Sequence, residues 1–479
     1  MPTILQWVRL LEEKIQQQTW YAAPYERRYR NEHVLPFIER EFREVYGSKV
    51  DALGSELQPP RVGMAGIGVD ALVERMTVLG ADSEDAAAAK RVDYAFKGND
   101  LDVMQREAVR EALVKRVSFA QIDRSADGRA VVGIEAAEQM AVHRMQHPPY
   151  DVDAALKVSV NEWTGQRTAR LWLIGRTVDL LEADMAQHDP EGSNIVSRWA
   201  VVADVPSRLP VVPVVEFAHK ARLLADPTSE IEPIASLCDI VDLIEGLMVF
   251  AGHFGAVPIR FGKGIELPKD KDGKPILDKD GRPMLGFNPR ADHVWITTSK
   301  DAEFGQLTPA GLTSFVEWSD HAVSQIRSIT KVASSYYRLD LKSHMSAELL
   351  KVDEAPMVRR VKSMGQYGSF GVAWRKLMQI ILMIEDPAST ALVQPRWGDP
   401  ETRIESAAAD GVQKLVASGM GVQTAAKKLL GWSEAEVSAA VAEYDAAEAR
   451  KVERDALAND PVVSALTKQT SDGAASVGA

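Results

Sequence analysis

The chain has 479 residues, 46% of them hydrophobic and 26% charged, which is typical of a soluble globular protein with two to four domains. No apolar run reaches about 18 residues, so no membrane-spanning helix is expected, and the first residues lack the pattern of a signal peptide. The net charge of −12 argues against a basic surface that wraps nucleic acid, but does not exclude a protein that confines DNA. A single cysteine, Cys238, excludes an internal disulfide and a cysteine-rich metal site, and its apolar neighbours predict a buried structural thiol.

The first 116 residues are predicted to be mainly helical. Residues 3–18 have the apolar spacing of one amphipathic helix. The aromatic and arginine-rich stretch 19–33 that follows suggests a surface loop, and the alternative is a contact with another subunit, because Tyr, Trp and Arg are common interface anchors. Residues 63–116 show helical periodicity that is interrupted at Gly80 and at Gly98-Asn99.

The character of the sequence changes at Ser118. Short β-rich runs extend from there to about Phe217, with Asp127-Gly128 between two of them as a hairpin signal. This pattern predicts a mainly antiparallel β-domain of about a hundred residues.

A long helix is predicted from Ser229 to Gly255. Ser229 and Glu232 have the spacing of a capping box at its start. Asp239, Asp242 and Glu245 lie on one face of this helix, because they are three residues apart. Periodicity leaves two interpretations open for these carboxylates, a solvated acidic stripe or an acidic stripe that faces a lumen.

Residues 256–308 form a turn-rich insert. It contains two Asp-Lys-Asp-Gly units eight residues apart, at 270–273 and 278–281. Their spacing does not fit an EF-hand, so Asp-Gly turns in a small β-hairpin domain are expected. The run 293–298 predicts a further strand.

A second long helix is predicted over 309–332, and the polar and aromatic segment 333–345 after it lacks a helical stripe. The strongest helical signal follows, from Ser346 to about Glu385. Pro356 and the glycines at 365, 368 and 371 predict that this helix is bent. Its first half is basic, and the basic face is either solvated beside acidic neighbours or in contact with DNA or another subunit.

The C-terminal part is predicted to contain three short helical runs after the turn at Trp397-Gly398. They cover 402–417, 422–430 and a run from Ser433, which forms a capping box with Glu436. The tail 456–479 is small and polar, and is predicted to be disordered.

The sequence contains no strong catalytic motif. Walker A, HExxH and GxSxG patterns and Cys/His metal spacing are missing, so no catalytic residue, metal or cofactor is assigned. The pair Asp239 and Asp242 would allow a Mg²⁺-dependent nuclease only if further ligands converged on them.

The order of the segments resembles the portal proteins of tailed double-stranded DNA phages, particularly the siphophage type. The phrases that carry the resemblance are ALKVSV, RTVDLLEA, SEIEPIASLCDIVDLIEGLM, SAELLKVDEAPMVRRV, FGVAWRKLMQIILMI and PRWGDPETRIESAAADGVQKLVASGM. It covers residues 100 to 450 approximately, and each phrase is moderately specific on its own.

The resemblance implies an α+β, mainly helical subunit with a β-rich wing, a two-helix stem, a small β clip and a helical crown. The implied segments are a wing at 1–225, stem helices at 226–255 and 309–332, a clip at 256–308, a tunnel loop at 333–345, a long wing helix at 346–399, and a crown at 400–455.

The resemblance also implies a function without covalent chemistry. Subunits of this family form a ring, usually of twelve, at one capsid vertex of the virion, having assembled in the host cytoplasm. Double-stranded DNA passes through the ring during packaging and ejection. The expected partners are the terminase large subunit, a head-completion or adaptor protein, and the major capsid and scaffolding proteins, with no membrane involved.

Within that architecture, Tyr336, Tyr337, Arg338 and Lys342 would belong to the tunnel loop, and Asp239, Asp242 and Glu245 would be candidates to face the lumen. Arg338 and Lys342 would touch phosphates transiently. The two tyrosines would contact neighbouring loops or DNA, or would anchor the loop to its own subunit. The alternatives for the whole chain are a metal-dependent nuclease and a capsid component without a channel.

Overall fold

The computed structural model describes residues 2–46, 58–188, 196–223, 225–256, 260–264, 269–274, 276–277, 301–306, 311–337, 347–401, 405–421, 423–425, 437–443, 446 and 449–451. The chain divides into two compact units. The first comprises Met1–Met345 and Val352–Pro400, and the second comprises Ser346–Lys351 and Glu401–Ala479.

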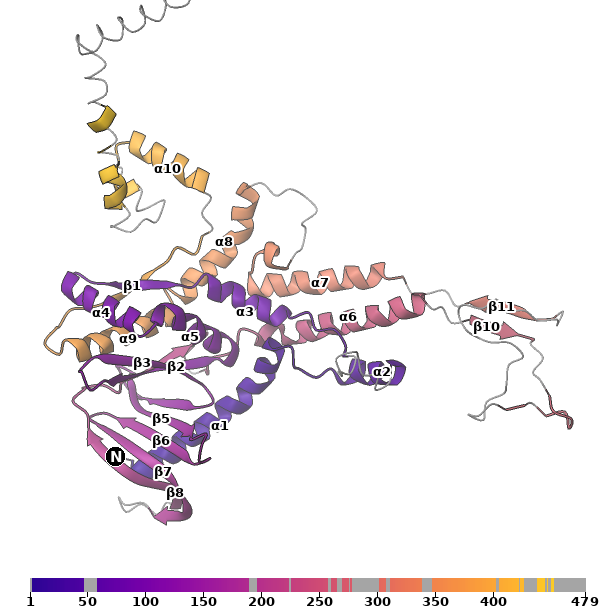
Figure 1. Ribbon diagram of the computed structural model, residues 1–479, viewed down its shortest axis with the longest axis horizontal. Helices are drawn as coiled ribbons and strands as arrows, with labels where there is room; N and C mark the ends of the chain where they lie inside the picture. The colour runs from indigo at the N-terminus through magenta and orange to yellow at the C-terminus, as the bar shows by residue number, and fades with distance from the viewer. Residues whose placement is uncertain are drawn as a thin grey trace, which may run out of the picture. The chain divides into compact units, whose positions relative to one another are not determined.

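The fold is of the α+β class, as predicted, with helices and several small antiparallel sheets (Figure 1). The α-helices are α1 (Ile4–Tyr29), α2 (Pro36–Tyr46), α3 (Met64–Glu74), α4 (Ala86–Gly98), α5 (Leu101–Lys115), α6 (Ala235–Ala256), α7 (Thr313–Thr330), α8 (Ala347–Met364), α9 (Ser369–Glu385) and α10 (Glu405–Ala417). The strands are β1 (Val78–Asp82), β2 (Val117–Arg124), β3 (Ala130–Ala136), β4 (Met140–Arg144), β5 (Val152–Val160), β6 (Arg167–Leu173), β7 (Arg176–His188), β8 (Val196–Pro206), β9 (Val214–Ala218), β10 (Arg260–Lys263), β11 (Glu303–Gln306) and β12 (Gln394–Trp397). Two short 3-10 turns are η1 (Glu232–Ile234) and η2 (Ser334–Tyr337).

Helix α1 is longer than predicted. It continues to Tyr29 through Pro24, so the expected surface loop at 19–33 is mostly helix. Tyr21, Tyr25 and Tyr29 are four residues apart and therefore share one face of the helix, and the rings of Tyr21 and Tyr25 lie 5.1 Å apart. The aliphatic residues predicted only the first half of α1. The three tyrosines continue the helical pattern into its second half.

The β-rich region forms two antiparallel sheets, which confirms the prediction for residues after Ser118. Five strands lie in the order β4-β5-β6-β7-β8, and three in the order β3-β2-β9. The hairpin signal at Asp127-Gly128 joins β2 to β3, with Gly128 at a φ of +90°. The N-terminal half of α1 buries Leu5, Val8 and Leu11 against the five-stranded sheet.

A small sheet joins distant parts of the first unit. The sequence predicted helix up to Gly80, whereas Val78–Asp82 is strand β1 and pairs antiparallel with β12. Helix α3 already ends at Glu74, and Gly80 lies inside β1 with a φ of +146°, which favours glycine. The pairing was missed because the partner strand is more than 300 residues away.

The long helix predicted from Ser346 to Glu385 is two helices, α8 and α9, separated at the glycine cluster. A Cβ atom at Gly368 would lie 2.3 Å from the carbonyl oxygen of Ser363. Glycine therefore permits a sharper break than the predicted bend. Helix α9 then packs Trp374 against Phe217 of β9, with ring centroids 5.1 Å apart.

Helices α6 and α7 run side by side, and the hairpin β10-β11 lies beyond their ends (Figure 1). They match the two predicted long helices, but α6 begins at Ala235 after the turn η1. The predicted capping box is wrong, because the Ser229 hydroxyl accepts from the backbone N–H of Ile231 at 3.1 Å, and Glu232 bonds to the Tyr21 hydroxyl instead. Ser229 is buried, and its hydroxyl does not cap α6.

The first Asp-Lys-Asp-Gly unit of the insert is a turn, as predicted. The Asp270 carboxylate accepts from the backbone N–H groups of Asp272 and Lys274, both at 2.9 Å, and Gly273 has a φ of +78°. The second unit and the strand predicted at 293–298 lie outside the described residues.

In the second unit, α10 ends at Ala417, and Gly419 follows with a φ of +98°. The residues at 437–443 are helical, while Ser433, Glu436 and the tail 456–479 lie outside the described residues.

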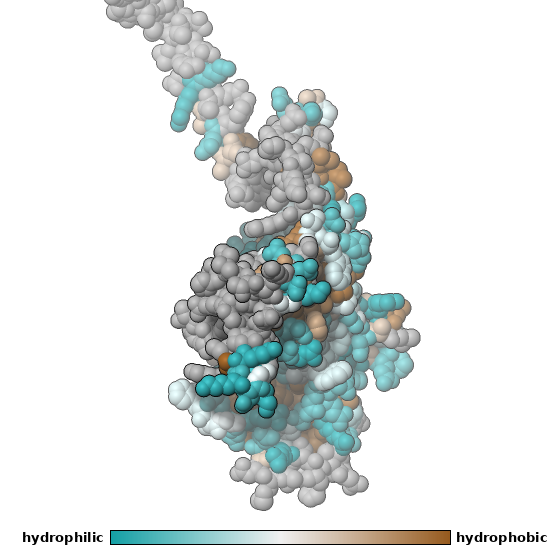
Figure 2. All heavy atoms as spheres, turned by 90° about the vertical axis from the view of Figure 1, so that its right-hand side faces the viewer, coloured by the Kyte–Doolittle hydropathy of each residue, from teal (hydrophilic) through white to brown (hydrophobic). Residues whose placement is uncertain are grey.

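No helix among the described residues is long and apolar enough to cross a membrane. Hydrophilic side chains predominate on the face seen from the β10-β11 end, with smaller apolar areas among them (Figure 2).

Candidate functional site

The helix pair α6–α7 is held together by an apolar seam. Val241 of α6 is buried in one core cluster with Val323 and Ile326 of α7, and Ile244 of α6 is also buried. At the edge of this seam, the Ser319 hydroxyl donates to Glu245 Oε1 at 3.4 Å. Glu245 therefore lies at the contact between the two helices.

Asp239 lies against the end of α1. Arg28 donates to both oxygens of its carboxylate, with Nε at 2.9 Å and Nη2 at 2.7 Å. The two side chains are 21% and 28% exposed, so the pair is partly shielded from water. This bidentate geometry is the strongest that an arginine makes with a carboxylate, and it fastens α1 to α6.

Asp242 is buried, at 3% exposure. Its Oδ1 accepts from the backbone N–H of Val62 at 2.8 Å, and its Oδ2 lies 3.0 Å from His33 Nε2. The same imidazole nitrogen lies 3.6 Å from Asp239 Oδ1. A buried carboxylate bonded in this way holds the segment before α3 against α6, and this placement does not suit a role in facing a lumen.

Residue spacing does not identify Arg28 and His33 as the partners; their position in the aromatic and arginine-rich stretch is the only signal for them. Neither interpretation of that stretch, a surface loop or a contact with another subunit, describes Arg28, which contacts helix α6 of the same chain. Each of the three carboxylates on α6 thus contacts a neighbour inside the subunit. Spacing alone could not distinguish such neighbours from solvent or a lumen.

A buried ionic cluster lies just before α6. Glu230 is 1% exposed, and its Oε2 lies 2.6 Å from Arg360 Nη2, 3.2 Å from Lys220 Nζ and 3.3 Å from His219 Nε2. Burial alone would raise the pKa of Glu230, but the hydrogen bond from His219 and the charges of Arg360 and Lys220 outweigh it and hold the pKa at about 2. Glu230 is therefore ionised in the folded protein at neutral pH.

Arg360 also donates to the carbonyl oxygen of Thr330, the last residue of α7. One guanidinium thus contacts both the residues that precede α6 and the end of α7. Arg360 belongs to the basic first half of the helix predicted from Ser346 to Glu385, for which a solvated face beside acidic neighbours and a contact with DNA or another subunit were the alternatives. For Arg360 the structure shows a third arrangement, an internal ion pair.

The turn η2 follows α7 and contains Tyr336 and Tyr337. Asp353 of α8 holds its start, accepting from the backbone N–H of Ser334 at 2.7 Å and from the Ser334 hydroxyl at 2.8 Å. The Tyr336 hydroxyl donates to Glu74 Oε2 at 3.3 Å and accepts from Arg75 Nε at 3.4 Å.

Tyr337 is buried at 7% exposure, and a Cβ atom added to Gly68 of α3 would lie 3.1 Å from its hydroxyl oxygen. Burial, the main cause, raises the pKa of Tyr337 to about 12. Both tyrosines thus contact their own chain, which was one of the two predicted possibilities. Arg338 and Lys342 lie outside the described residues.

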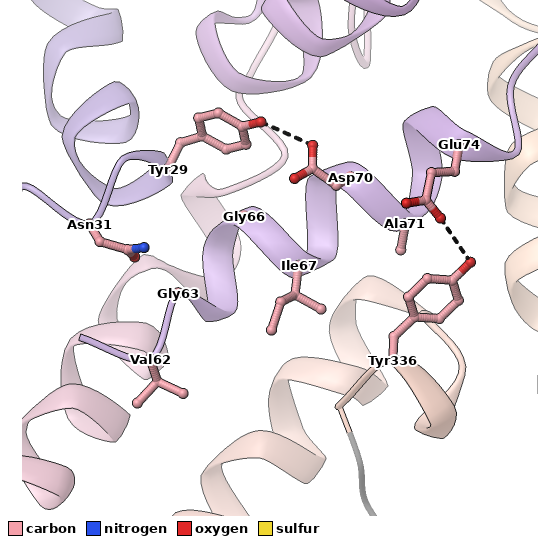
Figure 3. Close-up of a pocket in the computed structure, with 10 residues that line it drawn as sticks. All are labelled: Tyr29, Asn31, Val62, Gly63, Gly66, Ile67, Asp70, Ala71, Glu74 and Tyr336. Carbon is pink, nitrogen blue, oxygen red and sulfur yellow. Dashed lines mark hydrogen bonds between the residues drawn. The ribbon is translucent and has the colours of Figure 1, made fainter. Parts of the chain in front are cut away.

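A cavity of about 540 Å³ lies between the end of α1, α3 and η2, and Tyr336 forms part of its wall (Figure 3). Tyr29 donates to Asp70 Oδ1 at 3.0 Å on one side, and Tyr336 and Glu74 pair on another. Each of these polar groups is satisfied within the wall, so the cavity displays no converging catalytic groups.

Cys238 is buried at 4% exposure, as predicted. Burial, and next to it the charges of Asp242 and Asp239, raise the pKa of its thiol to about 12. The thiol therefore remains protonated and unreactive at neutral pH.

The described residues contain no group of three or more His, Cys, Asp or Glu side chains arranged to hold a metal ion. The carboxylates once considered for Mg²⁺ already accept hydrogen bonds, Asp239 from Arg28 and Asp242 from Val62. The arrangement can position helices and hold charge, but it offers no nucleophile or general base beside an open site.

Two curated proteins are similar to this chain over most of its length. The portal protein of Mycobacterium phage L5 is 26% identical over 383 residues, which is 75% of this chain and 73% of that protein. The portal protein of Mycobacterium phage D29 is 25% identical over 400 residues, which is 78% of this chain and 77% of that protein. No protein-family model matches the chain.

Solved structures of gene transfer agent particles show a weaker likeness. A chain from the neck of the native particle, computed with C12 symmetry, has a TM-score of 0.44 and 11% identity, with 81% of this chain and 93% of that chain covered. A chain from the neck of the empty particle has a TM-score of 0.43 and 12% identity, with 77% and 90% covered. The assignment rests on the two sequence relatives, both of which are portal proteins. The chain is thus a homologue of the portal proteins of tailed phages, as the order of its segments predicts.

Proposed function

We propose that this chain is the repeated subunit of a ring-shaped channel at one capsid vertex, through which double-stranded DNA enters during packaging and leaves at infection. The similarity to two portal proteins over about three quarters of the chain carries the proposal. The subunit would assemble in the host cytoplasm and remain in the virion as the head–tail connector.

The pair α6–α7 with its terminal hairpin supports a stem and clip. Two long helices packed along an apolar seam form a stiff rod, and β10-β11 gives that rod a separate end. The hairpin end would dock the terminase large subunit during packaging and a head-completion or adaptor protein afterwards. Major capsid and scaffolding proteins would contact the β-rich wing.

Handling of DNA would be electrostatic. Arg338 and Lys342, which follow η2 in the chain, would touch phosphates transiently as the duplex passes. Of the three carboxylates proposed for the lumen, Asp239 and Glu245 remain candidates in the assembled ring, because only Asp242 is buried. Tyr336 and Tyr337 would anchor the segment to its own subunit.

Negative-stain electron microscopy of the purified chain tests the proposal. Rings with a central hole wide enough for duplex DNA are expected. A capsid component without a channel would show no such hole, and a solely monomeric protein would overturn the proposal. Incubation of the rings with plasmid DNA and Mg²⁺ tests the nuclease alternative, and the DNA should remain intact.

A further inference from the structure

Two exposed faces with apolar side chains lie on different sides of α6. One belongs to α2 and the other to α7, and each of these helices packs on α6 (Figure 1). We infer that the free face of α2 in one copy of the chain packs against the flank of α7 in the next copy. This inference rests on the proposed ring and names the surfaces that would close it.

Helix α2 has a covered side and a free side. On the covered side, Ile38 and Phe42 are buried, and the Phe42 ring lies 4.7 Å from the ring of Phe250 in α6. On the free side, Phe37 is 53% exposed, and the Arg40 guanidinium lies 5.7 Å from the centre of its ring. A large aromatic side chain left half exposed next to an arginine is a typical interface anchor.

Helix α7 also has a covered side and a free side. Ser319, Val323 and Ile326 face α6 and are buried, whereas Leu312 and Val316, four residues apart near its start, are 46% and 48% exposed. Asp320 lies on the same side of the helix one turn later, because it is four residues after Val316. The flank of α7 is therefore apolar at its start and acidic beyond.

The two faces carry charged side chains of opposite sign that form no ion pair with the described residues of their own subunit. Arg43 on α2, and Glu317 and Asp320 on α7, are exposed and make no ion pair with any of the described residues. Among the described residues, Arg40 pairs only within its own helix, with Glu41 at 3.2 Å and Glu44 at 3.9 Å. Contact between the faces would bring Arg43 to Glu317 and Asp320 while covering Phe37 and Val316.

The position of the faces determines the kind of assembly. Because the two surfaces differ and belong to different sides of the subunit, each copy would use one face towards each neighbour. Such a head-to-tail contact closes into a ring when its rotation is a full turn divided by a whole number and adds no shift along the axis, whereas a self-complementary contact stops at a dimer. The inferred contact therefore predicts rings of one polarity.

Cross-linking tests this contact directly. In the variant carrying both Phe37→Cys and Val316→Cys, a short bismaleimide should join successive subunits into a ladder of covalent multimers under denaturing conditions. Variants with only one of the two cysteines are the matched controls and should remain monomeric, because the contact joins unlike positions. Native Cys238 is buried and stays in place.

Charge reversal gives an independent measurement. Arg40→Glu with Arg43→Glu should reduce the ring fraction in size-exclusion chromatography, and adding Glu317→Arg with Asp320→Arg to the same chain should restore it. Circular dichroism should match the wild type throughout, because all four residues are exposed. Intact rings without a ladder and without sensitivity to charge would overturn the inferred contact and leave the proposed function standing. A wild-type chain that forms no rings would overturn both.

Discussion

Arg360 of α8 and Glu230, which precedes α6, are joined by a buried ion pair of 2.6 Å. The arginine also contacts the end of α7 at Thr330, so one side chain secures both helices of the proposed stem. Removing one partner of a buried pair leaves the other charge without compensation, which is costly.

We expect Glu230→Gln to lower the free energy of unfolding by about 3–5 kcal/mol at pH 7. The folded-state pKa of Glu230 is lowered from 4.5 to about 2, so its stabilising effect is complete above pH 4.5 and is lost as the pH falls towards 2. Urea denaturation at several pH values should show the difference between variant and wild type shrinking through this range. Glu13→Gln, at an exposed pair with Arg9, is the control and should have little effect. If the difference in unfolding free energy between variant and wild type did not depend on pH, the lowered pKa of Glu230 would be contradicted.

Gly368→Ala should destabilise the first unit, because the added Cβ would meet the carbonyl oxygen of Ser363 at 2.3 Å. We expect a loss of about 1–3 kcal/mol, typical of overpacking. Gly98→Ala, in a helix and with no atom within 4 Å of the new Cβ, is the matched control and should be neutral or stabilising. Equal thermal midpoints for the two variants would show that the break between α8 and α9 tolerates a side chain.

Cys238 should resist thiol reagents in the folded protein, because it is buried and its pKa is raised to about 12. Labelling with a maleimide at pH 7.5 should be negligible under native conditions and should reach one label per chain in denaturant. Since the chain has one cysteine, mass spectrometry reads the result without ambiguity. Rapid native labelling would mean that α6 separates from its neighbours in solution.

Replacing both Arg338 and Lys342 with Ala should reduce DNA packaging while rings still form. The expected cause is the loss of two transient phosphate contacts, and packaged DNA per particle measures it. Arg9→Ala with Arg27→Ala, at exposed positions of α1, controls for the change in net charge. Normal packaging by the double variant would remove these two residues from the proposed DNA path.

Local patterns predicted much of the fold. The alternation after Ser118, the Asp127-Gly128 hairpin and the two long helices are present, because each depends on residues close together in the chain. The pairing of β1 with β12 was missed, as was the continuation of α1 beyond residue 18 to Tyr29, since tertiary partners decide both. Ser229 shows the same limit, because burial gave its hydroxyl a different partner.

The candidate site was less predictable. The spacing of Asp239, Asp242 and Glu245 correctly placed them along one helix, but their partners come from α1, from the segment before α3 and from α7. Carboxylates that face solvent, a lumen or a neighbouring helix have the same spacing. The buried cluster around Glu230 could not be predicted either, because its four members are spread from His219 to Arg360.

The pairing of β1 with β12 also determines when, during synthesis, the subunit can finish folding. Val78 pairs with Trp397, and Val393 lies in the same core cluster as Leu72 and Phe96. During synthesis on the ribosome, strand β1 therefore acquires its partner only after most of the chain has been made. A truncated polypeptide that ends before β12 would leave this edge of β1 unpaired, and only chains translated through β12 would complete the first unit.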